Sequence, residues 1–240
     1  MAALPEFTKP PITEVVSSIT FNKLSSFLSP HVGQLWERYR SDFPDCRDLP
    51  PLAVVIESPD PAGLRSFEYS DVPPLPRSWF ISRDQTNLIQ FQQDRFLFNW
   101  KRVRDDSVYP RYSTVKSKFD DLFQEFLGFL SETNTGSVDP IQYELTYVNH
   151  ILFEDGLQTN ADIGEVFKDF CWDSSSERFL SPPEVLDWRS KISVPELPGR
   201  LHYSMRSATR NIDKKNLVVF ELIVRGMAND KTDESKDKWL

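Results

Sequence analysis

One stretch near the middle of the chain most constrains the fold, because two hydrophobic periods follow each other there. Phe96, Phe98 and Trp100 alternate with other residues, which is typical of a half-buried antiparallel strand. A second apolar run, at residues 88–92, comes before this strand in the chain. The two residues between them are typical of a tight turn, so the pair predicts a hairpin. Apolar residues then recur at three- and four-residue steps over residues 115–130, which predicts a long amphipathic helix. We therefore expect an α+β fold in which helices cover an antiparallel sheet.

The rest of the chain alternates short β-branched or aromatic runs with two weaker helical patterns. Ser29 followed by Pro30 is typical of a helix start, and Asn160 or Asp162 can cap the later helix. Seven prolines between residues 47 and 76 predict an irregular surface connection with one short strand. The predicted strands are residues 12–21, 52–56, 79–81, 88–92, 95–101, 141–147, 188–194, 201–205 and 217–224, and the predicted helices are residues 29–43, 113–130 and 163–170.

The order of these elements suggests a duplication within a single domain. A strand, a helix, three or four strands and a helix are followed by a strand, a helix and three strands. We expect two pseudo-repeats of a β-α-β(3–4)-α unit, at residues 10–133 and 139–227, because residues 11–15 and 140–145 open them similarly. Residues 228–240 are predicted to be a charged tail or the start of a truncated helix.

Charge and cysteine content restrict the cellular compartment and the classes of binding partner that we expect. The 240 residues hold 28 basic and 36 acidic side chains, and the net charge of −8 opposes nonspecific attraction to nucleic acid. Cys46 and Cys171 are far apart, which predicts two buried thiols in a reducing compartment. No secretory leader and no apolar run of about 18 residues occurs, so we expect a cytoplasmic protein without a membrane partner.

No established catalytic or metal-binding motif is present. His31, His150 and His202 lie far from one another and from both cysteines, without metal-ligand spacing. Eight glycines against 18 prolines leave little material for a phosphate-binding loop, and no nucleophile elbow occurs. We therefore expect no metal, no cofactor and no catalytic residue.

Six short motifs are spread along the chain: PITEV (11–15), HVGQLWE (31–37), PRSWFI (76–81), LIQFQQDRFLFNW (88–100), YPRY (109–112) and ELTYVNHI (144–151). In combination they resemble a sporadically distributed bacterial protein family of uncharacterised function. The resemblance spans about residues 10 to 226 and implies no catalytic residue. Members of that family usually continue into a further helix, so the resemblance implies that a C-terminal helix is missing here. Patchy distribution suggests an accessory component of a bacterial defence or toxin-antitoxin module.

Arg95 and Asn99 form the first candidate site. They are four residues apart on one predicted strand, so both side chains fall on the face opposite Phe96. A guanidinium group beside an amide can bind an anionic ligand. The alternative is structural: Asp94 belongs to a turn, and Arg95 pairs with a neighbouring carboxylate.

Glu144 and His150 form the second candidate site, on one face of the strand that begins near residue 141. A carboxylate and an imidazole can perform acid-base chemistry near neutral pH. Six residues of strand separate them by about 20 Å, however, which prevents direct cooperation. The alternative is a polar strand face covered by hydrogen-bonding neighbours.

Residues 95–118 form the third candidate site, a basic segment that contains Arg102 and Arg111. Seven basic side chains are interleaved there with Trp100, Tyr109 and Tyr112, a composition that can bind nucleic acid or phosphate. A solvated strand end that leads into a helix has the same composition.

Three functions remain in competition. A non-enzymatic binding or regulatory protein with a protein partner, or a homo-oligomer, is favoured by the missing catalytic motifs and the many aromatic and arginine residues. A nucleic-acid-binding protein acting through residues 95–118 is disfavoured by the net charge. An enzyme of unknown reaction would use a polar pocket near Glu144 and Arg95.

Overall fold

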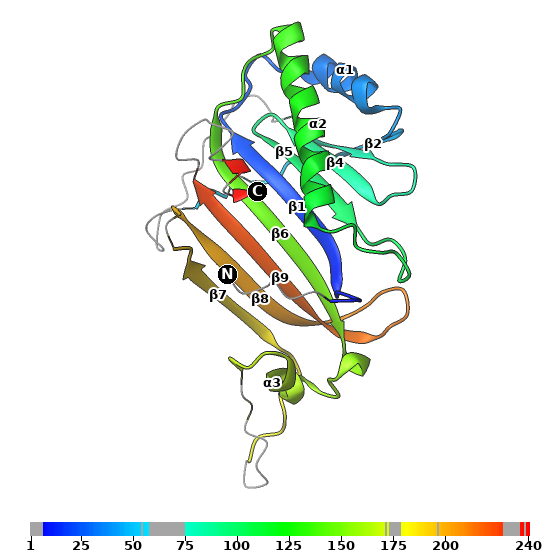
Figure 1. Cartoon of the computed structure of the whole chain (residues 1–240), viewed down its shortest axis with the longest axis vertical. Helices are drawn as coiled ribbons and strands as arrows, with labels where there is room; N and C mark the ends of the chain where they lie inside the picture. Colours follow the sequence, from blue (N-terminus) through cyan, green and yellow to red (C-terminus); the bar gives the residue numbers. More distant parts are fainter. Residues whose placement is uncertain are drawn as a thin grey trace.

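The computed structural model describes residues 7–53, 55–57, 75–170, 172, 179–195, 197–227, 236, 237, 239 and 240. Nine strands form one antiparallel sheet in the order β2-β3-β4-β5-β1-β6-β9-β8-β7 (Figure 1). The α+β class and the antiparallel sheet predicted from the sequence are confirmed. The strands are β1 Ile12–Phe21, β2 Asp45–Leu49, β3 Arg77–Ile81, β4 Asn87–Gln92, β5 Arg95–Lys101, β6 Pro140–Leu152, β7 Asp187–Ser193, β8 Gly199–Thr209 and β9 Asn216–Met227.

The centre of the sheet joins the two predicted halves of the chain. β1 pairs with β5 on one side and with β6 on the other, so Ile19 lies opposite both Phe96 and Tyr143. β6 continues the sheet through β9, where Leu145 lies opposite Val224. Because facing residues in antiparallel strands point to the same side, one face of the sheet carries aromatic and aliphatic side chains across both halves.

Two helices pack against this apolar face in the first half. The helix α2, Tyr112–Thr133, crosses the sheet over β5 and β1 (Figure 1). Its Phe126 is fully buried and stacks on Phe96 with ring centroids 5.2 Å apart. The helix α1, Ser29–Tyr39, begins one residue after Leu28, whose N–H donates to His31 Nδ1. Ser29 is thus the first helical residue and not the cap that the sequence predicts.

The second half has less helical cover within the described residues. The predicted helix at 163–170 is one turn long, α3 Ile163–Val166, after the short helices η1 Phe153–Asp155 and η2 Asn160–Asp162. It ends early because Phe167 adopts an extended backbone conformation. The Phe167 ring packs on that of Phe220, with the ring centroids 4.7 Å apart. No described helix lies along β7 and β8 (Figure 1), so helical cover over the whole sheet is not confirmed.

Two further predictions in the first half are wrong. The strand expected at residues 52–56 is absent from the residues described there; the edge strand is β2, which pairs with β3 through Arg47 and Trp79. Cys46 lies on β2 and is exposed, not buried as predicted. Cys171 lies outside the described residues.

The described end of the chain docks on the apolar face. Trp239 and Leu240 are 4% and 5% exposed, and the Tyr112 hydroxyl donates to the Leu240 carbonyl. The Trp239 ring lies over the paired glycines Gly199 and Gly226, where a Cβ on Gly226 would come within 1.9 Å of the ring. Trp239 and Leu240 are therefore part of the core.

None of the helices described is both long and apolar enough to cross a membrane.

Candidate ligand-binding face

The sheet has a second face, opposite α2, which we call the polar face. Its side chains alternate with the core residues, so Arg95 and Asn99 lie on it while Phe96 and Phe98 point to α2. One cross-strand row runs from Gln92 through Arg95 and Thr20 to Gln142. The sequence-based assignment of Arg95 and Asn99 to one face is confirmed by this register.

A chain of amide groups crosses the first half of the polar face. Trp79 Nε1 and Arg77 Nη1 donate to Gln90 Oε1 at 2.9 and 3.2 Å. Gln90 Nε2 donates to Asn99 Oδ1, and Asn99 Nδ2 donates to Glu14 Oε1 at 2.5 Å. Asn99 is 3% exposed and both ends of its amide have partners. It therefore serves the structure, while it also aligns Gln90 beneath Arg77.

Arg95 keeps an unused donor. It is 8% exposed, and its Nε lies 3.1 Å from Asp94 Oδ1, as the structural alternative predicts. Its Nη2 is buried and has no hydrogen-bond partner. A buried donor without a partner costs about 1–3 kcal/mol, so this guanidinium group is only partly satisfied by the protein.

Arg77 has the same property beside Arg95. Its Nε is buried without a partner, and its guanidinium carbon lies 5.2 Å from the centre of the Trp79 ring. Burial lowers the pKa of Arg77 below its ordinary value, and the positive charge of Arg95 lowers it further. Two cations with spare donors therefore lie close together, with Asp94 as the carboxylate paired to Arg95.

A segment from the proline-rich connection crosses this face, and we call it the strap: Leu52, Ala53, Val55, Ile56 and Glu57. Two buried glutamines hold its main chain. Leu52 N–H donates to Gln92 Oε1 at 2.9 Å, and Gln92 Nε2 donates back to the Leu52 carbonyl at 3.3 Å. Glu57 N–H donates to Gln142 Oε1 at 2.7 Å, and Gln142 Nε2 donates to the Val55 carbonyl at 3.0 Å.

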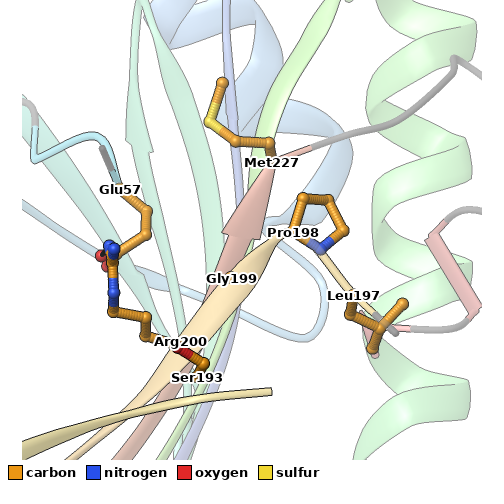
Figure 2. A pocket seen from close by; sticks show the side chains of 7 residues that line it. All are labelled: Glu57, Ser193, Leu197, Pro198, Gly199, Arg200 and Met227. Carbon is orange, nitrogen blue, oxygen red and sulfur yellow. Dashed lines mark hydrogen bonds and ion pairs between the residues drawn. The ribbon is translucent and has the colours of Figure 1, made fainter. Parts of the chain in front are cut away.

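The strap ends in a buried ion-pair cluster. The Glu57 side chain is 6% exposed, with Oε1 2.5 Å from Arg200 Nη1 and Oε2 2.6 Å from His202 Nε2. Burial would raise the pKa of Glu57, but the hydrogen bonds from Arg200 and His202 outweigh it and hold the pKa below its ordinary value. Figure 2 shows Arg200 reaching Glu57 on the side of β8 away from α2.

A cavity of about 250 Å³ opens beside this cluster. It combines the two charged side chains with apolar residues at the ends of β8 and β9, so it can hold a small group with one anionic and one apolar part. Glu57, Ser193, Leu197, Pro198, Gly199, Arg200 and Met227 line it (Figure 2).

The candidates on β6 do not form a site with each other. Glu144 Oε2 accepts from Arg225 Nε at 2.6 Å on the neighbouring strand β9. His150 lies near the far end of β6, where burial, Arg210 and Arg206 lower its pKa. Neither residue lines the cavity beside Glu57. The arrangement corresponds to the structural alternative for Glu144, a strand residue satisfied by its neighbour.

The basic side chains of residues 95–118 do not share one surface. Arg95 is buried on the polar face, while Lys116 lies on α2 and bonds to Asp120 and Asp237. Arg102 donates to the Pro10 carbonyl, and burial lowers its pKa. Arg111 is exposed at the start of α2, with a φ of 73°. The structure does not bring Arg102 or Arg111 into the site around Arg95.

A second cavity, of about 410 Å³, lies at the other end of the second half, between η2 and the hairpin of β8 and β9. Asn160 in its wall donates to the carbonyls of Pro183 and Glu184 and accepts from Ser207. The amide of Asn160 is therefore engaged in holding the loop that contains Pro183 and Glu184.

Among the described residues, no group of three or more His, Cys, Asp or Glu side chains could hold a metal ion. Comparison with models of known protein families and with curated protein sequences finds no match for this chain.

Sequence reasoning missed the residues that hold the strap. Arg200 and His202 are two residues apart on a strand, so alternation alone would have placed them on one face. Gln92 and Gln142 carry no comparable signal, because a glutamine that bonds to the main chain of a distant segment resembles any polar strand residue. Glu57 lies in the proline-rich connection, which shows no periodicity.

Proposed function

We propose that this protein is a non-enzymatic binding protein that holds an anionic ligand on the polar face of its sheet. The observation that carries the proposal is the buried Nη2 of Arg95, which has no partner; Arg77, whose positive charge interacts with that of Arg95, also has a buried Nε without a partner. An oxyanion such as a carboxylate or a phosphate accepts several hydrogen bonds and would pair with both groups.

The neighbourhood favours binding over catalysis. Asn99 and Gln90 are fully engaged in holding each other and Glu14, so they position Arg77 without a free group for proton transfer. Glu144 is paired with Arg225 and is separated from Arg95 by β1. The carboxylate and the guanidinium group that an enzyme would use therefore face different partners.

Titration with inorganic phosphate and with acetate, followed by calorimetry, tests the proposal. We expect the wild-type chain to bind at least one of them and Arg95→Met to weaken that binding at least about tenfold, because a hydrogen bond to a charged group is worth about 1.5–3 kcal/mol. Arg206→Met is the matched control, since it removes an exposed arginine that lies on the same polar face of the sheet but on the distant strand β8. Equal binding by Arg95→Met and wild type, or no binding by the wild type, would contradict the proposal.

We also propose that the fold arose from two copies of one unit. The strand order supports this, since the first strand of each half pairs with its last, β1 with β5 and β6 with β9, and the earlier strands follow outward. To test this, residues 10–133 and residues 139–227 are expressed separately and then mixed. The measurement is whether each half folds in the mixture. A role in a bacterial defence or toxin-antitoxin module stays a prediction, which the neighbouring genes of the coding gene would test.

A further inference from the structure

The hydrogen bonds that attach the strap to the polar face come from its main chain. Leu52, Val55 and Ile56 are 42%, 43% and 39% exposed. The attachments are four main-chain hydrogen bonds to Gln92 and Gln142. Among the strap residues that the structure describes, only Glu57 has a buried side chain, and it lies between two partners. The face therefore recognises an extended main chain and one carboxylate, and any peptide that offers both meets the same groups.

The geometry corresponds to an extended chain that runs across the strands. Gln92 lies on β4 and Gln142 on β6, three strand spacings apart, which is about 14 Å. Glu57 follows Leu52 by five positions, which span about 16 Å when the chain is extended. Arg95 and Thr20 lie in the same row between the two glutamines. The strap consequently passes over the row that contains Arg95.

The strap leaves this row incompletely satisfied. Ala53, which follows the Leu52 attachment to Gln92 on the way toward Gln142, offers no side-chain acceptor. The Nη2 of Arg95 and the Nε of Arg77 remain without partners. A chain with an acidic residue at this point would satisfy donors that the strap cannot.

We infer that the strap occupies in cis the binding site of an extended acidic peptide from a partner protein. The partner peptide carries two acidic residues about four positions apart. One meets Arg95 and Arg77, and the other replaces Glu57 between Arg200 and His202. The inference rests on the proposed function for its first acidic residue only, because the second is bound by a different pair of side chains.

Competition between the strap and a peptide of the same sequence tests the inference. The probe is the capped hexapeptide LAVVIE, residues 52–57, labelled for fluorescence anisotropy. Glu57→Gln weakens the strap but not the site, so we expect this variant to bind LAVVIE about tenfold more tightly than the wild type does. The peptide LAVVIQ should bind the variant at least about tenfold more weakly than LAVVIE.

Matched variants locate the binding. In the Glu57→Gln background, Arg200→Met should abolish LAVVIE binding, whereas Arg206→Met, on the same face of β8, should leave it unchanged. The peptide LDVVIE carries a carboxylate at the position of Ala53 and should bind more tightly than LAVVIE. That gain should disappear in Arg95→Met.

The outcomes separate the two proposals. Discrimination between LAVVIE and LAVVIQ without any gain for LDVVIE supports the strap as an occupant and contradicts the anion site at Arg95. Phosphate binding that depends on Arg95, together with peptides that bind Glu57→Gln and wild type equally, overturns the inference and keeps the proposed function.

A second measurement covers the case in which Glu57→Gln does not fold. In the wild type, excess LAVVIE should displace the strap and accelerate hydrogen exchange at the Glu57 amide, because tethered segments compete at effective concentrations of about millimolar. LAVVIQ at the same concentration should have a smaller effect. Equal exchange with both peptides would overturn the inference.

Discussion

The two faces of the sheet share every strand but bury their side chains against different partners. Under α2, Phe96, Phe119 and Phe126 are fully buried within the hydrophobic core. On the polar face, Gln90, Gln92, Asn99 and Gln142 are nearly as buried, but each is held by directed hydrogen bonds. The stability of the apolar face depends on how completely its side chains fill the space between sheet and helix. The stability of the polar face depends on the pairing of hydrogen-bond donors with acceptors. A substitution should therefore act through a cavity on one face and through an unpaired group on the other.

The largest effect should come from a cavity in the apolar face. Phe126 is fully buried and its ring lies 5.2 to 6.2 Å from those of Phe21, Phe91, Phe96 and Phe123. Phe126→Ala should lower the free energy of unfolding by about 3–5 kcal/mol. Urea denaturation measures this, and Ile212→Ala, at a side chain that is 86% exposed, should change the value by less than about 0.5 kcal/mol. Similar losses for both variants would remove the basis of the comparison.

Overpacking the same face should have the next largest effect. An added Cβ on Gly226 collides with Trp239, so Gly226→Ala should cost about 1–3 kcal/mol or expel the end of the chain. Limited proteolysis of the C-terminus and denaturation distinguish these two results. Gly128→Ala is the control: its Cβ meets nothing within 4 Å on α2, and it should stabilise the protein by about 1 kcal/mol. Retention of both stability and the docked terminus in Gly226→Ala would contradict the packing described here.

On the polar face, removal of a charge should stabilise the protein. Arg95→Met eliminates a buried donor without a partner, so the free energy of unfolding should rise by about 1 kcal/mol. A denaturation curve at neutral pH measures the change. Loss of stability would mean that the fold needs the Arg95 and Asp94 pair, and the interpretation of Arg95 as a ligand-binding group would lose its support.

The smallest effect should depend on pH and arise at the end of the strap. The pKa of Glu57 is lower in the folded chain than its ordinary value of 4.5. The stabilisation that the ionised Glu57 carboxylate gives to the strap is therefore fully present above that pH. It is lost as the pH falls through the lowered pKa and the carboxylate takes up a proton. Wild type and Glu57→Gln should therefore differ in hydrogen exchange of the strap at pH 7 and converge at strongly acidic pH. A difference that persists there would show that another group controls the strap.

The apolar face was predictable from the sequence and the polar face only in part. Alternation of Phe96, Phe98 and Trp100 defines both the strand and its inward side, because each buried residue contributes independently to the pattern. Alternation also assigned Arg95 and Asn99 to the opposite side. It could not show that Asn99 is bonded to Glu14 from the start of the chain, since that pairing depends on the position of β1 in the sheet.

The strap marks the limit of such reasoning. Residues 52–56 look like a strand because they are apolar and β-branched, yet β3 takes its partner from Asp45–Leu49 instead. The strap then bonds to glutamine side chains, which supply the amide groups that a neighbouring strand would otherwise supply. Side-chain amides at the right spacing on a finished sheet have no local signature in either segment.

The central position of β1 has a consequence for the chain as it leaves the ribosome. β1 is made first and can pair with β5 as soon as Lys101 emerges, but its other edge waits for β6, whose Val148 carbonyl accepts from Thr13 Oγ1 across 135 positions. About fifty further residues must be made before β6 is complete, which takes roughly 3–10 s at ordinary synthesis rates. During that interval the nascent protein exposes an unpaired edge of its most central strand, the kind of edge that joins other chains. Shielding of that edge, or rapid translation of the interval, would keep the nascent chain from such pairing.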